Sequence, residues 1–533
     1  MSEAERWDYV IVGSGFGGSV SALRLVEKGY RVLLLEQGRR LGQDDFPTTN
    51  WNLKRWMWIP RLGFRGIFRM TFFRHLTALS GVGVGGGSLV YANTLPTPKE
   101  PFYGASSWAH LAPWKDELAP HYDTALRMLG AVENALPDEA ERTLERVARG
   151  RGQADGYHLT RVGVYFGDPD NETPDPFFGG EGPPRTGCQG CGGSMTGCRH
   201  GAKNSLDMNY LYLAEKKGLT LQADTEVTWV KPQEGGGYTI TARQGASIFR
   251  RRKITYQAEH VILAGGVLGT VPLLLKLRRS AQGLPRLSPR LGEMVRTNSE
   301  CLIGVTSSRR DLDLSKGVAI GAILETDDKS HLELVRYAEG SGFFRTIGLP
   351  HVPGRNVLGR MARVAMALVR HPLLYLRAFT VPDWAKYTTI LLYMRALEGT
   401  LKLKLGRKLS TGFARGLISA KGDGERATAH MPEATELAWQ VAKEVRGVPM
   451  SILQEALLGV PTTAHVLGGC CMGESEEEGV IDSSHRVFGY EGLYVIDGSA
   501  ISANPGVNPS LTITALGERA MKLIPEASSA VGP

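Results

Sequence analysis

The sequence near the N-terminus reads DYVIVGSGFGG from residue 8 to residue 18. Its β-branched start predicts a short strand over residues 8–12. Apolar residues on one side predict a helix over residues 19–29, and a second apolar run predicts a strand over residues 31–35. Strand, helix and strand in this order predict a βαβ unit.

Glycines occupy the turn between the first strand and the helix. Gly13 permits the tight turn, Gly15 lets the backbone approach a pyrophosphate, and Gly18 lets the helix pack closely on the strand. The helix N-terminus offers free N–H groups and a positive dipole end to phosphates. Glu36, at the end of the second strand, can accept hydrogen bonds from a ribose diol. The pattern predicts a dinucleotide site without distinguishing FAD from NAD.

The composition is that of an ordinary globular protein. The chain has 533 residues, enough for two or more domain cores, with 42% hydrophobic and 22% charged residues. Its formal net charge of +8 favours anionic partners, but no recognition helix, zinc finger or long basic run favours nucleic acid. The sequence shows no secretory signal and no apolar stretch long enough to span a membrane, so we expect a cytoplasmic protein.

Further stretches decide the cofactor. They read SGVGVGGGSLVYAN over residues 80–93, HVLGGCCM over 465–472, LYVIDGSAI over 493–501 and NPGVNPSLTITALGE over 504–518. In order, spacing and residue type the chain resembles the glucose–methanol–choline (GMC) family of flavin oxidoreductases, and within it the branch of bacterial cholesterol oxidases. The resemblance selects FAD as the dinucleotide.

The resemblance implies an α/β fold, in which a Rossmann-like FAD-binding domain of the GMC type accompanies a discontinuous substrate domain. The substrate domain would be built on an antiparallel sheet with helices. The FAD-binding domain would take residues 1–105, 196–300 and 462–533, and the substrate domain would take residues 301–461. Residues 106–195 would form a cap and loop region that carries a cysteine cluster.

Positions that match the family's cofactor contacts can be named one by one. They are Gly85, Gly86, Ser88, Asn93, Val227, Asp497 and Gly498, in addition to the first glycine-rich loop and Glu36. In the family a covalent flavin is attached to a histidine near the second glycine-rich loop. His75 precedes that loop at a position that does not match, so we expect the FAD to be held without a covalent bond.

His465 matches the family's active-site histidine, and Asn508 matches its partner beside the flavin. A neutral imidazole, with an ordinary pKa near about 6.5, suits removal of the hydroxyl proton while hydride leaves the carbinol carbon. The Asn508 amide can hold the substrate oxygen or contact the flavin without titrating. The glutamate that shuttles a proton in cholesterol oxidases aligns best with Glu333, and Glu339 in the following loop is the alternative.

Three cysteines, Cys188, Cys191 and Cys198, lie in one glycine-rich loop. CxxC followed by a third cysteine is typical of a thiolate-bound metal or iron–sulfur site. Three thiolates suit a [3Fe–4S] cluster that passes electrons to an outside acceptor, whereas zinc would need a fourth ligand such as His200. Three free thiols in a tight loop are the third interpretation. The neighbours Cys470 and Cys471 are expected to pack as small apolar residues.

Segments rich in basic and large apolar residues occur at 51–74, 358–377 and 387–408. On a helical wheel of about 100° per residue, four arginines of the second segment share one arc and apolar residues fill much of the rest, while Pro372 predicts a break into two shorter helices. These arginines are Arg360, Arg363, Arg370 and Arg377. Such helices suit the surface of an anionic bilayer, and core helices or a dimer interface are the alternatives. We therefore expect peripheral contact with the inner face of a membrane.

Together these patterns predict an FAD-dependent enzyme that transfers hydride from the CH–OH group of a sterol or another bulky apolar alcohol to the flavin. The electron acceptor would be oxygen, a redox protein or a quinone, and long-chain primary alcohols are the nearest alternative substrates. A non-catalytic flavoprotein that relays electrons is the alternative class, but a relay would not need His465 together with Asn508. The second glycine-rich loop argues against a nicotinamide enzyme.

Overall fold

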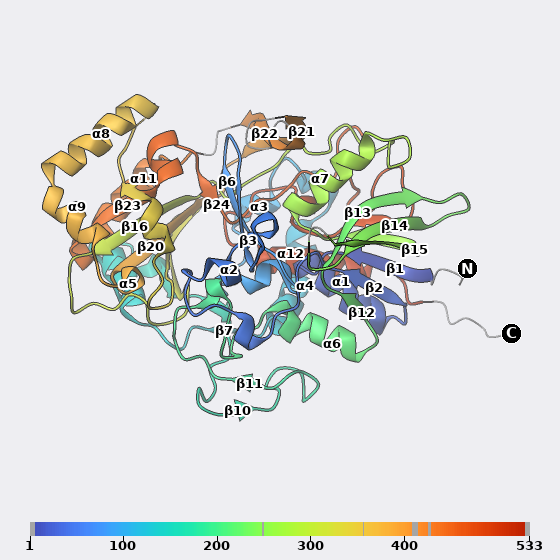
Figure 1. Cartoon of the computed structure of the whole chain (residues 1–533), viewed down its shortest axis with the longest axis horizontal. Helices are drawn as coiled ribbons and strands as arrows, with labels where there is room; N and C mark the ends of the chain where they lie inside the picture. Colours follow the sequence, from blue (N-terminus) through green and yellow to red (C-terminus); the bar gives the residue numbers. More distant parts are fainter. Residues whose placement is uncertain (1–5, 248–249, 355, 408–413, 425–427, 528–533) are drawn as a thin grey trace.

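The computed structural model describes residues 6–247, 250–354, 356–407, 414–424 and 428–527. Two large sheets dominate it and lie toward opposite ends of the molecule, with both termini at the end that carries the first sheet (Figure 1). The chain passes between the two ends more than once, so each end combines segments that are distant in the sequence.

The first sheet contains the predicted βαβ unit. Its strands lie in the order β12 (Thr220–Gln222), β2 (Val32–Leu35), β1 (Arg6–Val12), β15 (Arg252–Leu263), β14 (Tyr238–Gln244) and β13 (Thr225–Pro232), and β25 (Leu493–Val495) pairs with β15. Strands β12, β2, β1, β15 and β25 run parallel, whereas β13 and β14 add an antiparallel ribbon. Strand β2 and residues 9–12 of β1 are apolar and almost fully buried, as expected for central strands that are covered on both faces.

Helix α1 (Phe16–Glu27) follows β1 and is buried along most of its length. It packs against both α12 (Ser510–Lys522) and α6 (Tyr210–Lys216), and α12 packs in turn on α4 (Trp114–Met128). The first domain thus takes α4 from residues 106–195 and α12 from the C-terminal part of the chain. Helix α7 (Val267–Arg278) begins where β15 ends.

The second sheet is antiparallel. Its order is β19 (Gly348–Pro350), β23 (Gly447–Ile452), β16 (Cys301–Ser307), β20 (Thr388–Arg395), β18 (Ser330–Val335), β17 (Ala322–Asp327) and β8 (Tyr157–Leu159). Strand β8 also comes from residues 106–195, which therefore contribute to both domains. A parallel first sheet with helices and a separate antiparallel sheet confirm the predicted fold class.

Alternation along these strands separates a core face from a cavity face. Ile303 and Val305 of β16 pack in a core with helices α5 (Glu139–Gly150) and α11 (Pro432–Val445). The intervening Leu302, Gly304 and Thr306 line a cavity on the other side of the sheet. The same alternation holds on β20 and β18, so one face is covered by helices and the other is free to hold a ligand.

A small sheet connects the two ends of the molecule. Its strands are β5 (Phe68–Phe72), β6 (Thr77–Gly81) and β24 (Thr462–Thr463). Strand β6 leads into the second glycine-rich loop, and β24 pairs with it in parallel just before His465. The pairing therefore fixes the loop and the histidine next to each other.

The remaining elements are short. They are α2 (Leu53–Trp56), α3 (Glu100–Tyr103), α10 (Trp384–Tyr387), and the strand pairs β3 (Trp58–Ile59) with β4 (Phe64–Arg65), β7 (Ala131–Glu133) with β9 (Arg161–Gly163), and β10 (Glu172–Thr173) with β11 (Arg185–Thr186). None of the described helices is long and apolar enough to cross a bilayer.

The basic, apolar segments at 358–377 and 387–408 differ in secondary structure. Pro372 does divide the second segment, into α8 (Val357–Arg370) and α9 (Pro372–Phe379). The assignment of residues 387–408 to the same helical pattern is wrong: Thr388–Arg395 is the buried central strand β20, and Gly399–Arg407 is strand β21, which pairs with β22 (Arg415–Gly424). The residues of β21 alternate between buried and more exposed positions, as a strand requires. Lys408 lies outside the described residues.

Arg360 also departs from its predicted place among the exposed arginines. Its side chain turns toward the protein, is buried, and donates to the carbonyl oxygens of Leu457 and Gly354. An arginine can end there because its guanidinium finds carbonyl acceptors inside the fold. The exposed arginines of the two helices are therefore Arg363, Arg370 and Arg377.

Candidate active site

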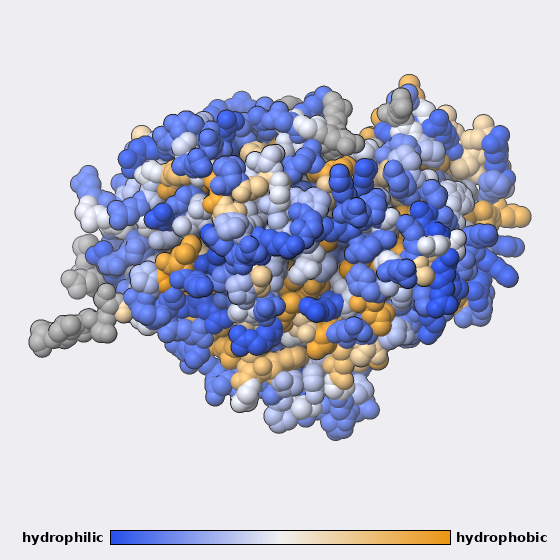
Figure 2. Space-filling model, turned by 180° about the vertical axis from the view of Figure 1, so that it is seen from behind, coloured by the Kyte–Doolittle hydropathy of each residue, from blue (hydrophilic) through white to orange (hydrophobic). Residues whose placement is uncertain are grey.

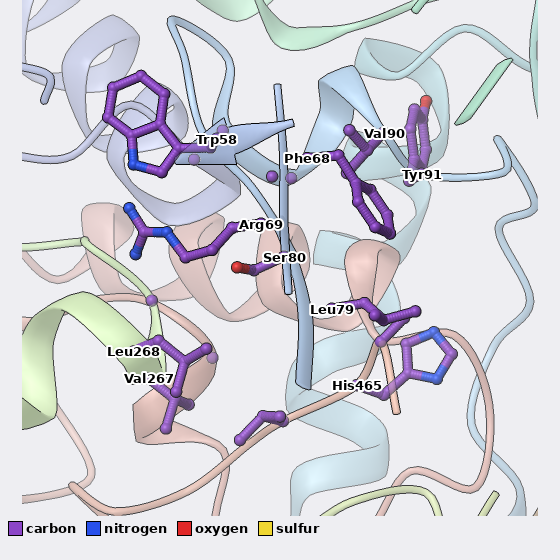
Figure 3. Close-up of a pocket in the computed structure, with 18 of the residues that line it drawn as sticks. Trp58, Phe68, Arg69, Leu79, Ser80, Val90, Tyr91, Val267, Leu268 and His465 are labelled. Atoms are coloured by element: carbon purple, nitrogen blue, oxygen red, sulfur yellow. The ribbon is translucent and has the colours of Figure 1, made fainter. Parts of the chain in front are cut away.

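A single cavity of about 1260 Å³ extends from the first glycine-rich loop to the inner face of the second sheet. Figure 3 shows its wall beside the β5–β6 hairpin, with Arg69 and Trp58 toward one end and Leu79 and His465 toward the other. Val267 and Leu268 at the start of α7 close a further side. The cavity is long enough to bring two ligands together, because it joins the glycine-rich end to the apolar chamber of the second sheet.

The first glycine-rich loop has no room for side chains at Gly13, Gly17 and Gly18. Gly13 has φ +105°, and an added Cβ would lie 2.5 Å from the Ala264 carbonyl oxygen. An added Cβ on Gly18 would lie 2.1 Å from the Gly13 carbonyl oxygen, which shows the close helix–strand packing that its position predicts. At Gly15 the nearest protein atom would be 3.9 Å away, and the residue lines the cavity.

These features fit a bound dinucleotide. No side chain caps the N-terminus of α1, so its N–H groups are free for phosphate oxygens. The second glycine-rich loop closes over the first, since an added Cβ on Gly86 would lie 2.8 Å from the Gly15 Cα. The fit rests on the backbone cradle itself.

Glu36, Val227, Asp497 and Gly498 all line the cavity. The Glu36 carboxylate accepts hydrogen bonds from Ser14 N (3.1 Å), Ser14 Oγ (2.8 Å) and Gly38 N (2.7 Å), and its burial raises the pKa of the carboxyl. Asp497 accepts from Gly266 N (2.8 Å) and Thr270 Oγ1 (2.6 Å), which ties the turn after β15 to the turn after β25. These acids therefore shape the cavity wall as well as facing its contents.

Gly86 is the member of the second loop's predicted contacts that lines the cavity, whereas Gly85, Ser88 and Asn93 lie behind it. Ser88 Oγ donates to the Gly85 carbonyl (2.7 Å) and accepts from Leu206 N (2.9 Å). The Asn93 amide donates to Ser194 Oγ (2.7 Å) and lines a smaller cavity beside the cysteine loop. Ser88 and Asn93 thus hold the loop in shape from behind.

His465 lies where the two parts of the cavity meet and is buried. Its Nδ1 is 2.9 Å from Oε2 of Glu300, the residue just before β16, although the two atoms do not have hydrogen-bond alignment. Burial alone would lower the pKa of His465, but the carboxylates of Glu300 and Glu333 outweigh it and raise that pKa above its ordinary value. The contact leaves Nε2 as the imidazole nitrogen available to a ligand.

Asn508 and Glu333 are brought together from opposite ends of the fold. Asn508 lines the cavity, and its Nδ2 donates to Oε2 of Glu333 at 3.2 Å. Glu333 is fully buried on β18, on the same side of the strand as Val335, which lines the cavity. Its other oxygen is 3.3 Å from His331 Nε2. Asn508 Oδ1 is buried and has no hydrogen-bond partner among the described residues.

Glu339, the alternative glutamate, and His75, the histidine before the second glycine-rich loop, lie outside the cavity. Glu339 is exposed and forms salt bridges with Lys316 and Lys386, so it does not reach the cavity. His75 Nδ1 lies 2.9 Å from Ser419 Oγ and is not part of the cavity wall.

Sequence patterns missed Glu300 and most of the apolar chamber. Glu300 precedes a strand as many surface acids do, and nothing in its neighbourhood marks it as the partner of a histidine 165 positions later. The chamber is formed by alternate residues of the second sheet and by side chains around it, among them Leu302, Ile390, Leu392, Val335, Tyr337, Phe344 and Met450. Only the sheet pairing brings them together.

The cysteine loop does not form the predicted metal site. Cys188, Cys191 and Cys198 line one small cavity of about 30 Å³ with His200, but across the described ranges no three Cys, His, Asp or Glu side chains lie close enough to hold a metal ion. The thiols are unpaired, and burial raises the pKa of Cys188 to about 12. Lys203, after the loop, donates to the carbonyls of Leu89, Tyr91 and Ser194, which joins the loop to the second glycine-rich loop. A [3Fe–4S] cluster or zinc ion therefore does not fit this arrangement.

Two family models match the chain. The FAD dependent oxidoreductase model matches residues 8–320, and the GMC oxidoreductase model matches residues 425–517. The first match includes the parallel sheet except for β25, together with both glycine-rich loops, and the second includes His465 and Asn508. The chain is therefore an FAD-dependent oxidoreductase.

Individual relatives cover nearly the whole chain. A cholesterol oxidase from Acinetobacter baumannii is 43% identical over 97% of this chain and 94% of its own length. A cholesterol oxidase from Mycobacterium tuberculosis is 43% identical over 97% of this chain and 91% of its own length. Among solved structures, pyridoxine 4-oxidase from Mesorbium loti has the same fold, with a TM-score of 0.62 at 15% identity over 97% of this chain and 98% of its own.

Proposed function

The chain belongs to the GMC oxidoreductase family, and on that premise we propose that it oxidises the hydroxyl group of a sterol, with oxygen as electron acceptor. The observation that carries the proposal is the junction at His465, where the dinucleotide cradle opens into an apolar chamber. The substrate class also follows the relatives named as cholesterol oxidases, which are 43% identical over almost the full chain.

The dinucleotide end supplies the redox partner. Bound FAD provides a two-electron acceptor for the hydride of the alcohol carbon. The protein's part there is to hold the cofactor by backbone contacts, with Gly15 and Gly86 facing each other and α1 directing its N-terminus at the phosphates.

His465 is the base in this proposal. Nε2 takes the hydroxyl proton, which lets the carbinol carbon release hydride. Glu300 acts as a positioning residue, because its carboxylate lies 2.9 Å from Nδ1 and stabilises the imidazolium that forms when the proton arrives. A buried carboxylate without hydrogen-bond partners among the described residues is suited to this task.

Asn508 and Glu333 complete the polar end of the chamber. Asn508 lines the chamber and can meet the substrate hydroxyl or the cofactor there, while its Nδ2 donates to Glu333. In the cholesterol oxidases the glutamate at this position shuttles a proton during double-bond migration, and we extend that role to Glu333. Its fixed contacts with Asn508 and His331 place a proton acceptor beside the chamber.

Oxygen is the acceptor that best agrees with the names of the most similar relatives described above. The relatives that are 43% identical over 97% of the chain are named as oxidases, which supports direct reaction with oxygen.

The test is an anaerobic titration of the purified, FAD-loaded protein with cholesterol, followed by absorbance. We expect the flavin bands to bleach, and to return with release of hydrogen peroxide when air is admitted. If the bands bleach only with long-chain primary alcohols, those alcohols and not sterols are the substrates. If the bands bleach with cholesterol and do not return in air, oxygen is not the electron acceptor.

A further inference from the structure

We infer that α8 and α9 form a docking surface for an anionic lipid bilayer. The inference rests on the proposed function, because it names where the enzyme would meet a substrate that is dissolved in lipid. In Figure 1 the two helices project at the end of the molecule opposite to both chain termini. From behind, Figure 2 shows orange, apolar atoms among blue ones at this same end.

The outward face of α8 is apolar, which is the reverse of an ordinary surface helix. The face toward the protein holds Arg360 and Val364, which are buried. At 100° per residue, the exposed residues Leu358, Ala362, Ala365 and Val369 fall within an arc of about 60° that lies roughly opposite to that face. Leu358 and Val369 are 80% and 76% exposed.

Helix α9 continues this face. Its inner side packs through Tyr375 and Ala378 against Val448, while Leu373 and Leu376 are exposed at 68% and 57%. Isolated exposed apolar residues are common on soluble proteins, but a contiguous set on two successive helices marks an interaction site.

The charge around this face selects the partner. Arg363, Arg370 and Arg377 are exposed on the same two helices, and residues 356–379 contain no Asp or Glu. None of these arginines forms a salt bridge with a carboxylate in the part of the chain that the structure describes. Arginines beside an apolar face match anionic headgroups above an acyl layer, as found on the cytoplasmic leaflet.

A second copy of the chain fits this surface less well. A symmetric interface would place the same patch on both partners, so three arginines of each copy would face those of the other without a carboxylate from either segment. That repulsion would disfavour pairing, whereas an anionic bilayer would neutralise the same charges.

The surface is continuous with the cavity described above. Ala378 and Phe379, at the end of α9, line the cavity together with Phe344 and Met450. The outer side of α9 is thus the exposed apolar surface, and its last turn is part of the chamber wall. A lipid-dissolved substrate would enter where the protein touches the bilayer, without crossing water.

The experiment is vesicle flotation with the full-length, FAD-loaded protein and sterol-free vesicles. We expect binding to vesicles of equal parts phosphatidylcholine and phosphatidylglycerol, and little binding to phosphatidylcholine alone. The variant Leu358→Asp/Val369→Asp should lose detectable binding. The variant Arg370→Gln/Arg377→Gln should bind the anionic vesicles about thirtyfold more weakly, since each arginine contributes about 1 kcal/mol near such a surface.

Leu523→Asp is the matched control, because Leu523 is 52% exposed near the C-terminus, at the other end of the molecule. It should bind as the wild type does, and all variants should oxidise detergent-dispersed cholesterol at the wild-type rate. Wild-type protein that does not float would overturn the inference, as would an aspartate variant that floats normally or changes a dimer into a monomer. Because these vesicles lack sterol, failure of the proposed oxidation would leave the binding result intact.

Discussion

The two ends of the cavity are built by different means. At the dinucleotide end the wall is mostly backbone, and positions such as Gly13, Gly17 and Gly18 have no space even for a methyl group. At the substrate end the wall is apolar sheet with buried carboxylates, Glu300 and Glu333, beside His465 and Asn508. One end recognises its ligand by shape, whereas the other controls where protons reside. Substitutions should therefore separate the two functions.

The largest expected effect is at His465. His465→Gln should reduce the rate of flavin reduction by alcohol about a thousandfold, because the base that takes the hydroxyl proton is lost. The FAD content should remain normal, since His465 lies outside the glycine-rich cradle. Anaerobic stopped-flow absorbance measures the rate, with the exposed His110→Gln as control. A wild-type rate in the His465 variant would contradict its role.

A substitution at Gly18 should instead weaken binding of the cofactor. An added methyl group would lie 2.1 Å from the Gly13 carbonyl oxygen, so Gly18→Ala should displace α1 and weaken FAD binding by about tenfold to a hundredfold. Flavin titration of the apoprotein measures the affinity. Gly104→Ala is the control, because nothing lies within 4 Å of its added Cβ. Equal affinity for both variants would show that close packing at Gly18 is not needed for the cofactor.

The third prediction concerns proton control by Glu300. The carboxylate raises the pKa of His465, so Glu300→Gln should lower that pKa and move the acid limb of kcat/KM to lower pH by about one unit. The base is active when neutral, so activity rises with pH through its pKa. The exposed Glu339→Gln should leave the profile unchanged. An acid limb that stays in place would remove Glu300 from the proposed mechanism.

The smallest effect is expected at Glu455, whose carboxylate accepts a hydrogen bond from the backbone N–H of Thr462, three residues before His465. Burial raises its pKa from 4.5 to about 8, so the folded protein retains a proton that the unfolded chain releases. Its contribution to stability is present below pH 4.5 and is lost as pH rises through about 8. Glu455→Gln should therefore raise Tm by a few degrees at pH 9 and change it little at pH 5, as calorimetry would show.

The sequence could predict the dinucleotide end of the cavity better than the substrate end. The first glycine-rich loop, Glu36 and the βαβ unit were predictable because each depends on neighbours within about 20 residues. Glu300 was not, because its meaning depends on β24 bringing His465 beside β16. The resemblance to the cholesterol oxidases pointed to Glu333, but only the pairing of the sheet shows that its side chain is buried.

The errors have equally local causes. Residues 387–408 carry basic and apolar residues like those of α8, yet they alternate with period two and belong to strands β20 and β21. Arg360 lies on the same arc of the helical wheel as the exposed arginines, but its guanidinium donates hydrogen bonds to carbonyl oxygens inside the fold. The cysteine spacing is typical of metal loops, although the three cysteines do not form a metal-ligand group among the described residues.

The position of α12 bears on how the protein is made. Val20 of α1 packs against Gly517 of α12, and β25 pairs with β15, so the first domain stays incomplete until residues 493–522 have been synthesised. A nascent chain that extends only as far as α7 would carry an uncovered apolar helix and an open strand edge. We expect the chain to acquire FAD only after residues 493–522 have joined the first domain.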